Sequence, residues 1–388
     1  MERFRASYKA TSLITGREVY GSTPPSVIVG ESRYPKVPVL YHVPPGVLGE
    51  EAKDYDNPPE WWGRLELNDI ISRRAYQVAS IVRVDVRDFT KLYETEISLA
   101  SVSVRPVDTE SLLKKPPNPR LTFRAGIDPI GPSAEAERIL VKGNASLPRR
   151  LENLVWDDVK AEVGILELYR DGVDIYTIIR ALSLGLLGEL RSRKLVPTRW
   201  AITATDTVLS NHMLRDVWTY PSINTVELYR GEYLSNRFFI LLYPGRYFAE
   251  WLEVWFPLTA YTKTAREPVI IYNRDVGVGK TLTPDGGFEA ARFSLIEALW
   301  RRGRRASALI VREILPSYYA GVGNWHIRET VRMALQEAPV RFGSVREALE
   351  FMRMELKRET SEALTKTIAA GKYRKLTEYT KTGGEGST

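Results

Sequence analysis

The chain has 388 residues, 44% hydrophobic and 27% charged, which is the composition of a folded globular protein. It contains no cysteine, which excludes disulfides, thiolate zinc sites, iron–sulfur clusters and a cysteine nucleophile. Its net charge is +7, and residues 301–388, with 17 basic and 10 acidic side chains, carry all of it. Such a bias suits a partner rich in phosphate groups, although a solvated helix face has the same composition.

Nothing in the sequence predicts a membrane protein. The first five residues lack the apolar stretch of a signal peptide, and no window approaches the apolar length of a membrane-spanning helix. We therefore expect a cytoplasmic protein. Few glutamines and methionines together with many charges fit a thermophile.

The first half of the chain mixes short strands, turns and helices. Proline and glycine in residues 1–60 disfavour long helices and leave room for a short edge strand at 26–29. Asn68 is a suitable N-cap for a helix at about 69–81. Further segments follow in chain order: strands at 81–86 and 101–104, loops at 114–119 and 128–133, and two helices within 157–192 that Gly172 separates.

The second half begins with strand-like and turn-like pieces over 199–275, including a strand at 238–243. A helix at 288–302, a buried strand at 306–314 and helices at 325–337 and 344–370 follow. Helices and strands alternate without a βαβ rhythm, so we predict an α+β fold with mostly antiparallel strands and a helical C-terminal region. The expected regions are an N-terminal one at 1–150, a main body at 151–370 and a tail at 371–388, although the first two could form one compact domain.

One glycine-rich segment resembles a phosphate-binding loop. It reads Gly-Val-Gly-Lys-Thr over residues 277–281. Arg274 stands where that loop needs its first glycine, and Pro284 interrupts the helix that should follow. A hairpin turn is the better prediction.

Candidates for acid–base or metal chemistry are few. His326 and Glu329 lie one turn apart on an expected helix, and Asp206 is a third candidate. A histidine hydrogen-bonded at a helix start explains the first two equally simply. We expect no metal and no cofactor, and the residues leave open whether the chain is an enzyme.

Basic segments are the clearest functional signal. Arg193, Lys194 and Arg199 surround a proline and precede Trp200, so the segment offers bidentate phosphate contacts and a ring on which a base can stack. A second basic segment holds Arg301, Arg302, Arg304 and Arg305. Trp325 and Arg328 are further candidates for nucleic-acid contact. The alternative for both segments is a helix C-terminus, where cations complement the dipole.

Three segments of the sequence are characteristic: Tyr-Gly-Ser-Thr-Pro-Pro-Ser-Val-Ile-Val-Gly at 20–30, the block 193–203, and Gly-Asn-Trp-His-Ile-Arg-Glu at 323–329. In these segments the sequence resembles the archaeal Nre family of DNA-repair proteins. The resemblance implies a role in DNA repair, a place at the nucleoid and a C-terminal motif for the replication sliding clamp. In that motif Tyr373 stands at the glutamine position, Leu376 and Tyr379 fit, and Thr380 replaces the second aromatic residue. The cysteine-rich segment of some members has no counterpart here.

Three hypotheses follow. The first is a DNA-repair factor that binds DNA, with RNA still open, and possesses a degenerate contact to the sliding clamp. The second is a metal-dependent enzyme that acts on damaged or branched nucleic acid through Asp206, His326 and Glu329. The third is a non-catalytic adaptor without DNA affinity of its own.

Overall fold

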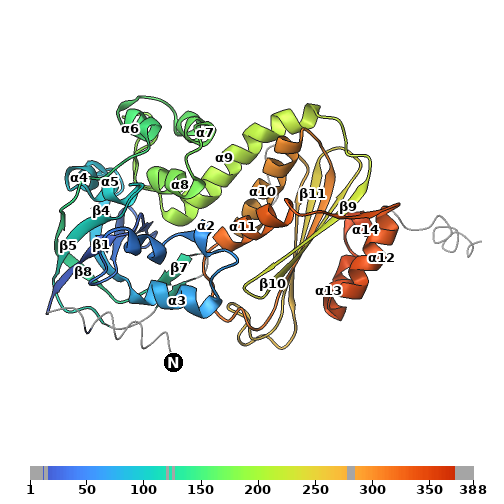
Figure 1. Ribbon diagram of the computed structural model, residues 1–388, viewed down its shortest axis with the longest axis horizontal. Helices are drawn as coiled ribbons and strands as arrows, with labels where there is room; N and C mark the ends of the chain where they lie inside the picture. The colour runs from blue at the N-terminus through green and yellow to red at the C-terminus, as the bar shows by residue number, and fades with distance from the viewer. Residues whose placement is uncertain (1–11, 13–15, 119–121, 125–126, 278–284, 372–388) are drawn as a thin grey trace, which may run out of the picture. The chain divides into compact units, whose positions relative to one another are not determined.

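The chain forms two compact units, each with its own six-stranded sheet (Figure 1). The structure, a computed structural model, describes residues 12, 16–118, 122–124, 127–277 and 285–371. The first unit comprises Met1–Leu209 and Ala320–His326, and the second comprises Ser210–Tyr319 and Ile327–Thr388. The expected boundary at residue 150 lies inside the first unit. In the described part of the chain, no helix is long and apolar enough to cross a membrane.

The sheet of the first unit has the strand order β1-β5-β8-β4-β3-β2. Its pairs are antiparallel except for β4 with β8. The strands are β1 (Glu18–Thr23), β2 (Val27–Val29), β3 (Lys36–Val43), β4 (Val78–Asp85), β5 (Val107–Leu113) and β8 (Ser133–Val141). The predicted strands near 26 and 81 are thereby confirmed. A separate pair joins β6 (Thr122–Arg124) to β7 (Ile127–Ile130), so the loop predicted at 128–133 is partly strand.

Short helices surround this sheet. They are the 3-10 helix η1 (Gly49–Tyr55) and α2 (Pro58–Trp61), α3 (Leu67–Tyr76), α4 (Thr90–Glu94), α5 (Ile97–Ser101), α6 (Arg149–Trp156), α7 (Ala161–Arg170) and α8 (Ile175–Ser183). Helix α3 begins earlier than predicted, because Glu66 and Asp69 form a capping box, and it gives way to β4 at Val78. The strand predicted at 101–104 is wrong: α5 ends there, and its serines bury their hydroxyls, Ser101 by donating to the Ile97 carbonyl.

Helix α9 (Thr198–Thr219) is the largest departure from the prediction, which placed strands and turns after residue 199. Its buried side carries Thr205, Asp206 and Ser210 beside Leu209 and Met213. Polar residues in the buried stripe hide the 3.6-residue apolar period that announces a helix. The helix begins in the first unit and continues into the second.

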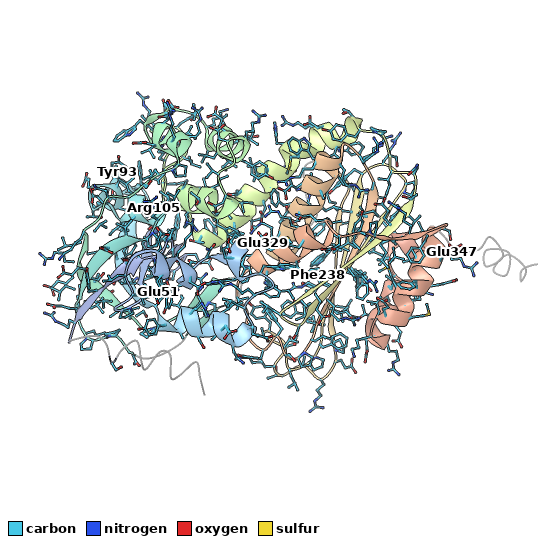
Figure 2. The ribbon with its side chains drawn as sticks, in the orientation of Figure 1. Glu51, Tyr93, Arg105, Phe238, Glu329 and Glu347 are labelled. Carbon is cyan, nitrogen blue, oxygen red and sulfur yellow. The ribbon has the colours of Figure 1, made fainter. Side chains whose placement is uncertain are left out.

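The sheet of the second unit has the order β12-β11-β13-β10-β9-β14, with β11 and β13 parallel and the other pairs antiparallel. Its strands are β9 (Val226–Tyr233), β10 (Asn236–Tyr243), β11 (Phe248–Trp255), β12 (Val269–Asp275), β13 (Ser307–Ile314) and β14 (Val340–Phe342). Helix α10 (Gly286–Arg302) covers one face (Figure 1). Phe238, on β10, is fully buried in this unit (Figure 2). Strands β10 and β13 and helix α10 confirm the predictions for these segments.

Three helices cover the other face: α12 (Val345–Glu355), α13 (Arg358–Leu364) and α14 (Ile368–Gly371) (Figure 1). They replace the single helix predicted at 344–370, because Leu356 has an extended backbone that ends α12. The carboxylate of Glu250 accepts the amides of Ile368 and Ala369 at 2.7 and 2.9 Å and so fixes the start of α14. With α11 (Trp325–Ala334), these helices confirm both the helical C-terminal region and the α+β class.

A charged cluster is buried between α10 and the sheet of the second unit. The guanidinium of Arg292 is ion-paired with Asp275 and with Glu289 and donates to the Asn211 side chain at 2.9 Å. The Tyr247 hydroxyl donates to Asp275 at 2.9 Å, and burial raises the pKa of this phenol. Because Arg292, Asp275, Glu289 and Tyr247 are buried, each depends on the others for its solvation.

His42 makes the stability of the first unit sensitive to pH. The side chain is buried, and burial, assisted by the charge of Arg74, lowers its pKa from 6.5 to about 4. A histidine with a lowered folded-state pKa contributes stability above the unfolded pKa, and that contribution is lost as the pH falls toward the folded pKa. We expect the His42 contribution, about 3 kcal/mol, to disappear between about pH 6.5 and pH 4.

Urea unfolding of the wild type and of His42→Asn across this pH range measures the contribution. The difference in slope between the two proteins isolates the histidine from the carboxylates that titrate in the same range. Equal slopes would contradict a neutral, buried His42.

Candidate nucleic-acid interface

Arg193, in the first of the two predicted basic segments, is a structural residue. Its side chain is 7% exposed. Its guanidinium donates to four backbone carbonyls, those of Gly188 at 2.7 Å, Leu154 at 3.0 Å, Val155 and Asp157. Burial lowers its pKa, although the nearby carboxylate of Asp157 opposes the shift. Arg193, which was predicted to bind phosphate, therefore holds the segment after α8 against the end of α6.

Lys194, Arg199 and Trp200, the other predicted residues of this segment, are exposed. Lys194 precedes the buried Leu195, and Arg199 and Trp200 stand in the first turn of α9. The Arg199 guanidinium lies 3.8 Å from the Glu31 carboxylate in an exposed pair, which contributes little to stability. These three side chains are accessible to a ligand in solution.

Backbone hydrogen bonds hold this segment against two others. The Leu195 amide donates to the Val86 carbonyl at 2.7 Å, and the Val86 amide donates to the Pro35 carbonyl at 2.9 Å. The Thr198 hydroxyl accepts the Val29 amide at 2.8 Å. The turn between β2 and β3, the end of β4 and the start of α9 therefore form one continuous surface.

An aromatic pair lies on this surface. Tyr34, in the turn that follows the left-handed Arg33 (φ 62°), is 50% exposed, and Trp200 is 51% exposed. Their ring centroids are 6.2 Å apart with planes tilted by 35°. Sequence reasoning missed Tyr34 as a site residue, because no spacing connects it with Trp200 before the chain folds.

Exposed cations lie on the three segments that form this surface. Arg33, Lys194 and Arg199 are exposed, and so is Arg87, whose pKa is raised chiefly by its hydrogen bond with Asp85 and further by the phenol of Tyr34. Arg87 pairs with Asp85 at 2.9 Å, and its hydrogen bonds lower the pKa of that carboxyl to about 2. We call Arg33, Tyr34, Arg87, Lys194, Arg199 and Trp200 the turn surface.

The second basic segment ends α10, and Gly303, in the left-handed conformation, is its C-cap. Arg301 pairs with Glu297 at 2.8 Å, and Arg302 pairs with Glu227 at 2.9 Å and also donates to the Tyr229 hydroxyl. The structure also gives the other two arginines a backbone acceptor: Arg304 donates to Gly303, and Arg305 donates to Trp218. These arginines complete the end of a helix within the second unit.

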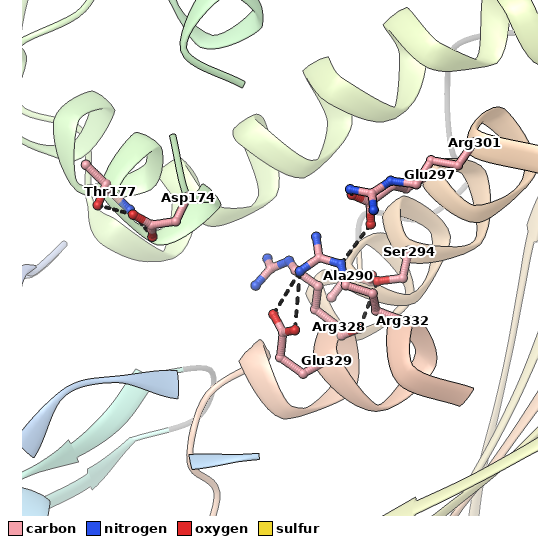
Figure 3. A network of polar contacts seen from close by, with 9 residues as sticks. All are labelled: Asp174, Thr177, Ala290, Ser294, Glu297, Arg301, Arg328, Glu329 and Arg332. Atoms are coloured by element: carbon pink, nitrogen blue, oxygen red, sulfur yellow. Dashed lines mark hydrogen bonds and ion pairs between the residues drawn. The ribbon is translucent and has the colours of Figure 1, made fainter. Parts of the chain in front are cut away.

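Trp325 and Arg328, on α11, are buried, and Trp325 packs edge-on against Trp61 with centroids 5.9 Å apart. The backbone carbonyl of Arg328 accepts the Ser294 hydroxyl at 2.9 Å. Figure 3 shows this contact beside an ionic bridge in which Arg332 joins Glu297 on α10 to Glu329. Both predicted nucleic-acid residues of α11 thus lie inside the protein.

The three candidate catalytic residues are also buried. Asp206 lies within α9, and Glu329 pairs with Arg332 at 3.1 Å. The Nδ1 of His326 is 2.7 Å from the Gly323 carbonyl and donates to it, as the hydrogen-bonded helix start requires. Over the described ranges, no three histidine, aspartate or glutamate side chains gather into a group that could hold a metal ion.

Comparisons with known proteins agree along most of the chain. The model of the family described as Archaeal Nre, N-terminal, matches residues 1–262, and that described as Archaeal Nre, C-terminal, matches residues 277–379. The chain belongs to the archaeal Nre family. Two similar relatives come from Archaeoglobus fulgidus: DNA repair protein NreB is 31% identical over 94% of this chain and 92% of its own length, and DNA repair protein NreA is 33% identical over 84% and 82%.

A third relative from the Nre family, DNA repair protein NreA of Haloferax volcanii, is 30% identical over 92% of this chain and 88% of its own length. No solved structure matches the chain. The clamp motif expected from the Nre family, with Tyr373, Leu376 and Tyr379, lies outside the described residues, as does most of the glycine-rich segment at 277–281.

Proposed function

We propose that this chain is a DNA-repair protein that binds nucleic acid directly through the turn surface of its first unit. The observation that carries the proposal is the set of exposed cations that three separate segments bring together around Lys194 and Arg199. The names of the three relatives, all DNA repair proteins, support the biological role. A place at the nucleoid would follow from that activity.

Phosphates are the natural ligands of this surface. Lys194 and Arg199 are exposed, and the backbone bonds around Leu195 and Thr198 fix their chain positions, so binding requires little ordering of the backbone. A guanidinium binds phosphate in bidentate fashion, and an ammonium binds it as a point charge. Arg301, Arg302, Arg304 and Arg305 are not part of the proposed surface, because they lie at the end of α10 in the second unit.

A charge-reversal experiment tests the proposal. We expect Lys194→Glu with Arg199→Glu to weaken the binding of labelled DNA at least about tenfold in fluorescence anisotropy, because two phosphate contacts become repulsive. The matched control is Arg341→Glu with Arg353→Glu, which makes the same change in net charge at two exposed arginines of the second unit. The control retains the wild-type affinity.

Two results would contradict the proposal. If the control loses as much affinity as the turn-surface variant, net charge and not this surface governs binding. If the wild type binds neither DNA nor RNA at low salt, the adaptor hypothesis replaces direct binding. Matched RNA in the same assay decides between the two nucleic acids.

The sliding clamp is a second proposed partner. Leu376 and Tyr379 keep two of the anchors of the clamp motif, and the tail around them is basic. With the glutamine and the second aromatic residue replaced, the contact is weak. Titration of purified clamp with the full chain and with a chain that ends at Gly371 tests it.

A further inference from the structure

We propose that the nucleic acid bound at the turn surface is single-stranded and that an unpaired base stacks on the Trp200–Tyr34 pair. This inference rests on the proposed function and narrows its ligand to one class. Half of each side chain is exposed, although large aromatic residues are usually buried to a greater extent. An aromatic ring beside exposed cations is the arrangement with which proteins hold single strands.

The exposed rings favour a single strand over a duplex for a geometric reason. In a duplex both faces of every base are covered by its neighbours, so a protein ring can reach a base face only at an end or after unstacking. An unpaired base offers its face at no such cost. Stacking is also tolerant of sequence, because every base has a π-face.

The backbone on both sides of the pair is held by hydrogen bonds. Trp200 stands in the first turn of α9, and the neighbouring Thr198 hydroxyl accepts the Val29 amide and contacts the Ser183 hydroxyl at 3.1 Å. Tyr34 is fixed from the other side, because the carbonyl of the next residue, Pro35, accepts the Val86 amide. The Ser183 hydroxyl in turn donates to the Val196 carbonyl at 2.7 Å. Because the backbone that carries the two rings is already ordered, a stacking base does not have to order it.

A second exposed tryptophan, Trp156, shows what the cations add to the Trp200 site. Trp156, also in the first unit, is 68% exposed and packs edge-on against Tyr93 with centroids 5.4 Å apart (Tyr93 is labelled in Figure 2). Its neighbours in the sequence are the exposed Asp157 and Asp158. Burial and, to a smaller extent, the charge of Glu152 raise the pKa of Tyr93. Carboxylates repel phosphates, so this second exposed tryptophan does not suit a nucleic acid. Exposure of a ring is therefore common to both pairs. Trp200 differs because exposed cations lie on its surface, although Arg87 and Arg199 each pair with a carboxylate.

The experiment compares two strands of equal length and charge. One is oligo(dT), and the other is a strand built entirely of abasic nucleotides, which keeps the phosphates and lacks the bases. We expect the wild type to bind oligo(dT) about tenfold more tightly. Trp200→Ala with Tyr34→Ala loses this preference, whereas Trp200→Phe retains most of it. The matched control, Trp156→Ala, leaves both affinities unchanged, and circular dichroism verifies the fold of every variant.

The outcomes separate this inference from the function on which it rests. Equal wild-type affinities for the two strands, or the same loss of preference in Trp156→Ala as in the variant with Trp200→Ala and Tyr34→Ala, would overturn base stacking while leaving phosphate binding intact. Tighter wild-type binding to a blunt hairpin duplex than to oligo(dT) would also overturn it. Failure of the wild type to bind any of these nucleic acids would remove the proposed function as well.

Discussion

Replacement of Arg193 by methionine should lower the free energy of unfolding by about 2–4 kcal/mol without weakening nucleic-acid binding by the molecules that remain folded. The guanidinium satisfies the carbonyls of Gly188, Leu154, Val155 and Asp157, and methionine keeps the volume but donates to none of them. Each buried carbonyl left without a donor costs about 1–3 kcal/mol. The loss is smaller than four such penalties, because the Leu154 carbonyl still accepts the Asp157 amide at 3.3 Å and Asp157 itself is exposed to water. Urea unfolding measures the loss, and anisotropy measures the affinity.

The adjacent residue provides the control for this prediction. Lys194 is exposed, so Lys194→Met should change stability by no more than about 0.5 kcal/mol. The same variant should weaken DNA binding, because it removes a cation of the turn surface. If Lys194→Met costs as much stability as Arg193→Met, or if Arg193→Met alone loses the affinity, the structural role of Arg193 and the binding role of Lys194 are wrongly assigned.

Replacement of Arg292 by methionine should destabilise the second unit by about 3–5 kcal/mol. The change removes the cation that pairs with the buried carboxylates of Asp275 and Glu289. The Tyr247 hydroxyl donates one hydrogen bond to Asp275 and does not replace the lost charge. Removal of one partner from a buried ion pair costs more than replacement of both, because an uncompensated charge stays in the interior. Chemical denaturation followed by circular dichroism measures the effect.

A double variant gives this prediction its internal check. Asp275→Asn added to Arg292→Met removes the buried, uncompensated charge of the Asp275 carboxylate. The double variant should therefore be more stable than Arg292→Met alone. Additive losses would mean that Arg292 and Asp275 do not interact energetically. That result would contradict the ionic cluster.

How much of the fold the sequence predicts depends on what each element buries. Strands β10 and β13 are continuous apolar runs, and α10 has a regular apolar side, so their residues alone identify them. Helix α9 buries Thr205, Asp206 and Ser210, which no periodicity of apolar residues reveals. The strand predicted at 101–104 rested on the alternation of Ser101 and Ser103 with two valines, but Ser101 ends α5, and both serines are buried.

The candidate site is predictable only in part, for a similar reason. Arg193 and Lys194 are equally basic neighbours, yet one is buried and the other exposed, and composition cannot assign those roles. Tyr34 joins Trp200 only after the turn following β2 meets the start of α9. The sequence identifies the segment that carries the surface, and the fold selects the side chains that are exposed on it.

The most direct test of the central claim, that the turn surface binds the phosphates of a nucleic acid, is the salt dependence of affinity for oligo(dT). Each phosphate contact on a single strand contributes about −0.7 to the slope of log affinity against log salt. Removal of two contacts in the Lys194→Glu, Arg199→Glu variant should make the slope less steep by about 1.4, while the Arg341→Glu, Arg353→Glu control keeps the wild-type slope. The same slope in the wild type and the turn-surface variant would contradict the claim.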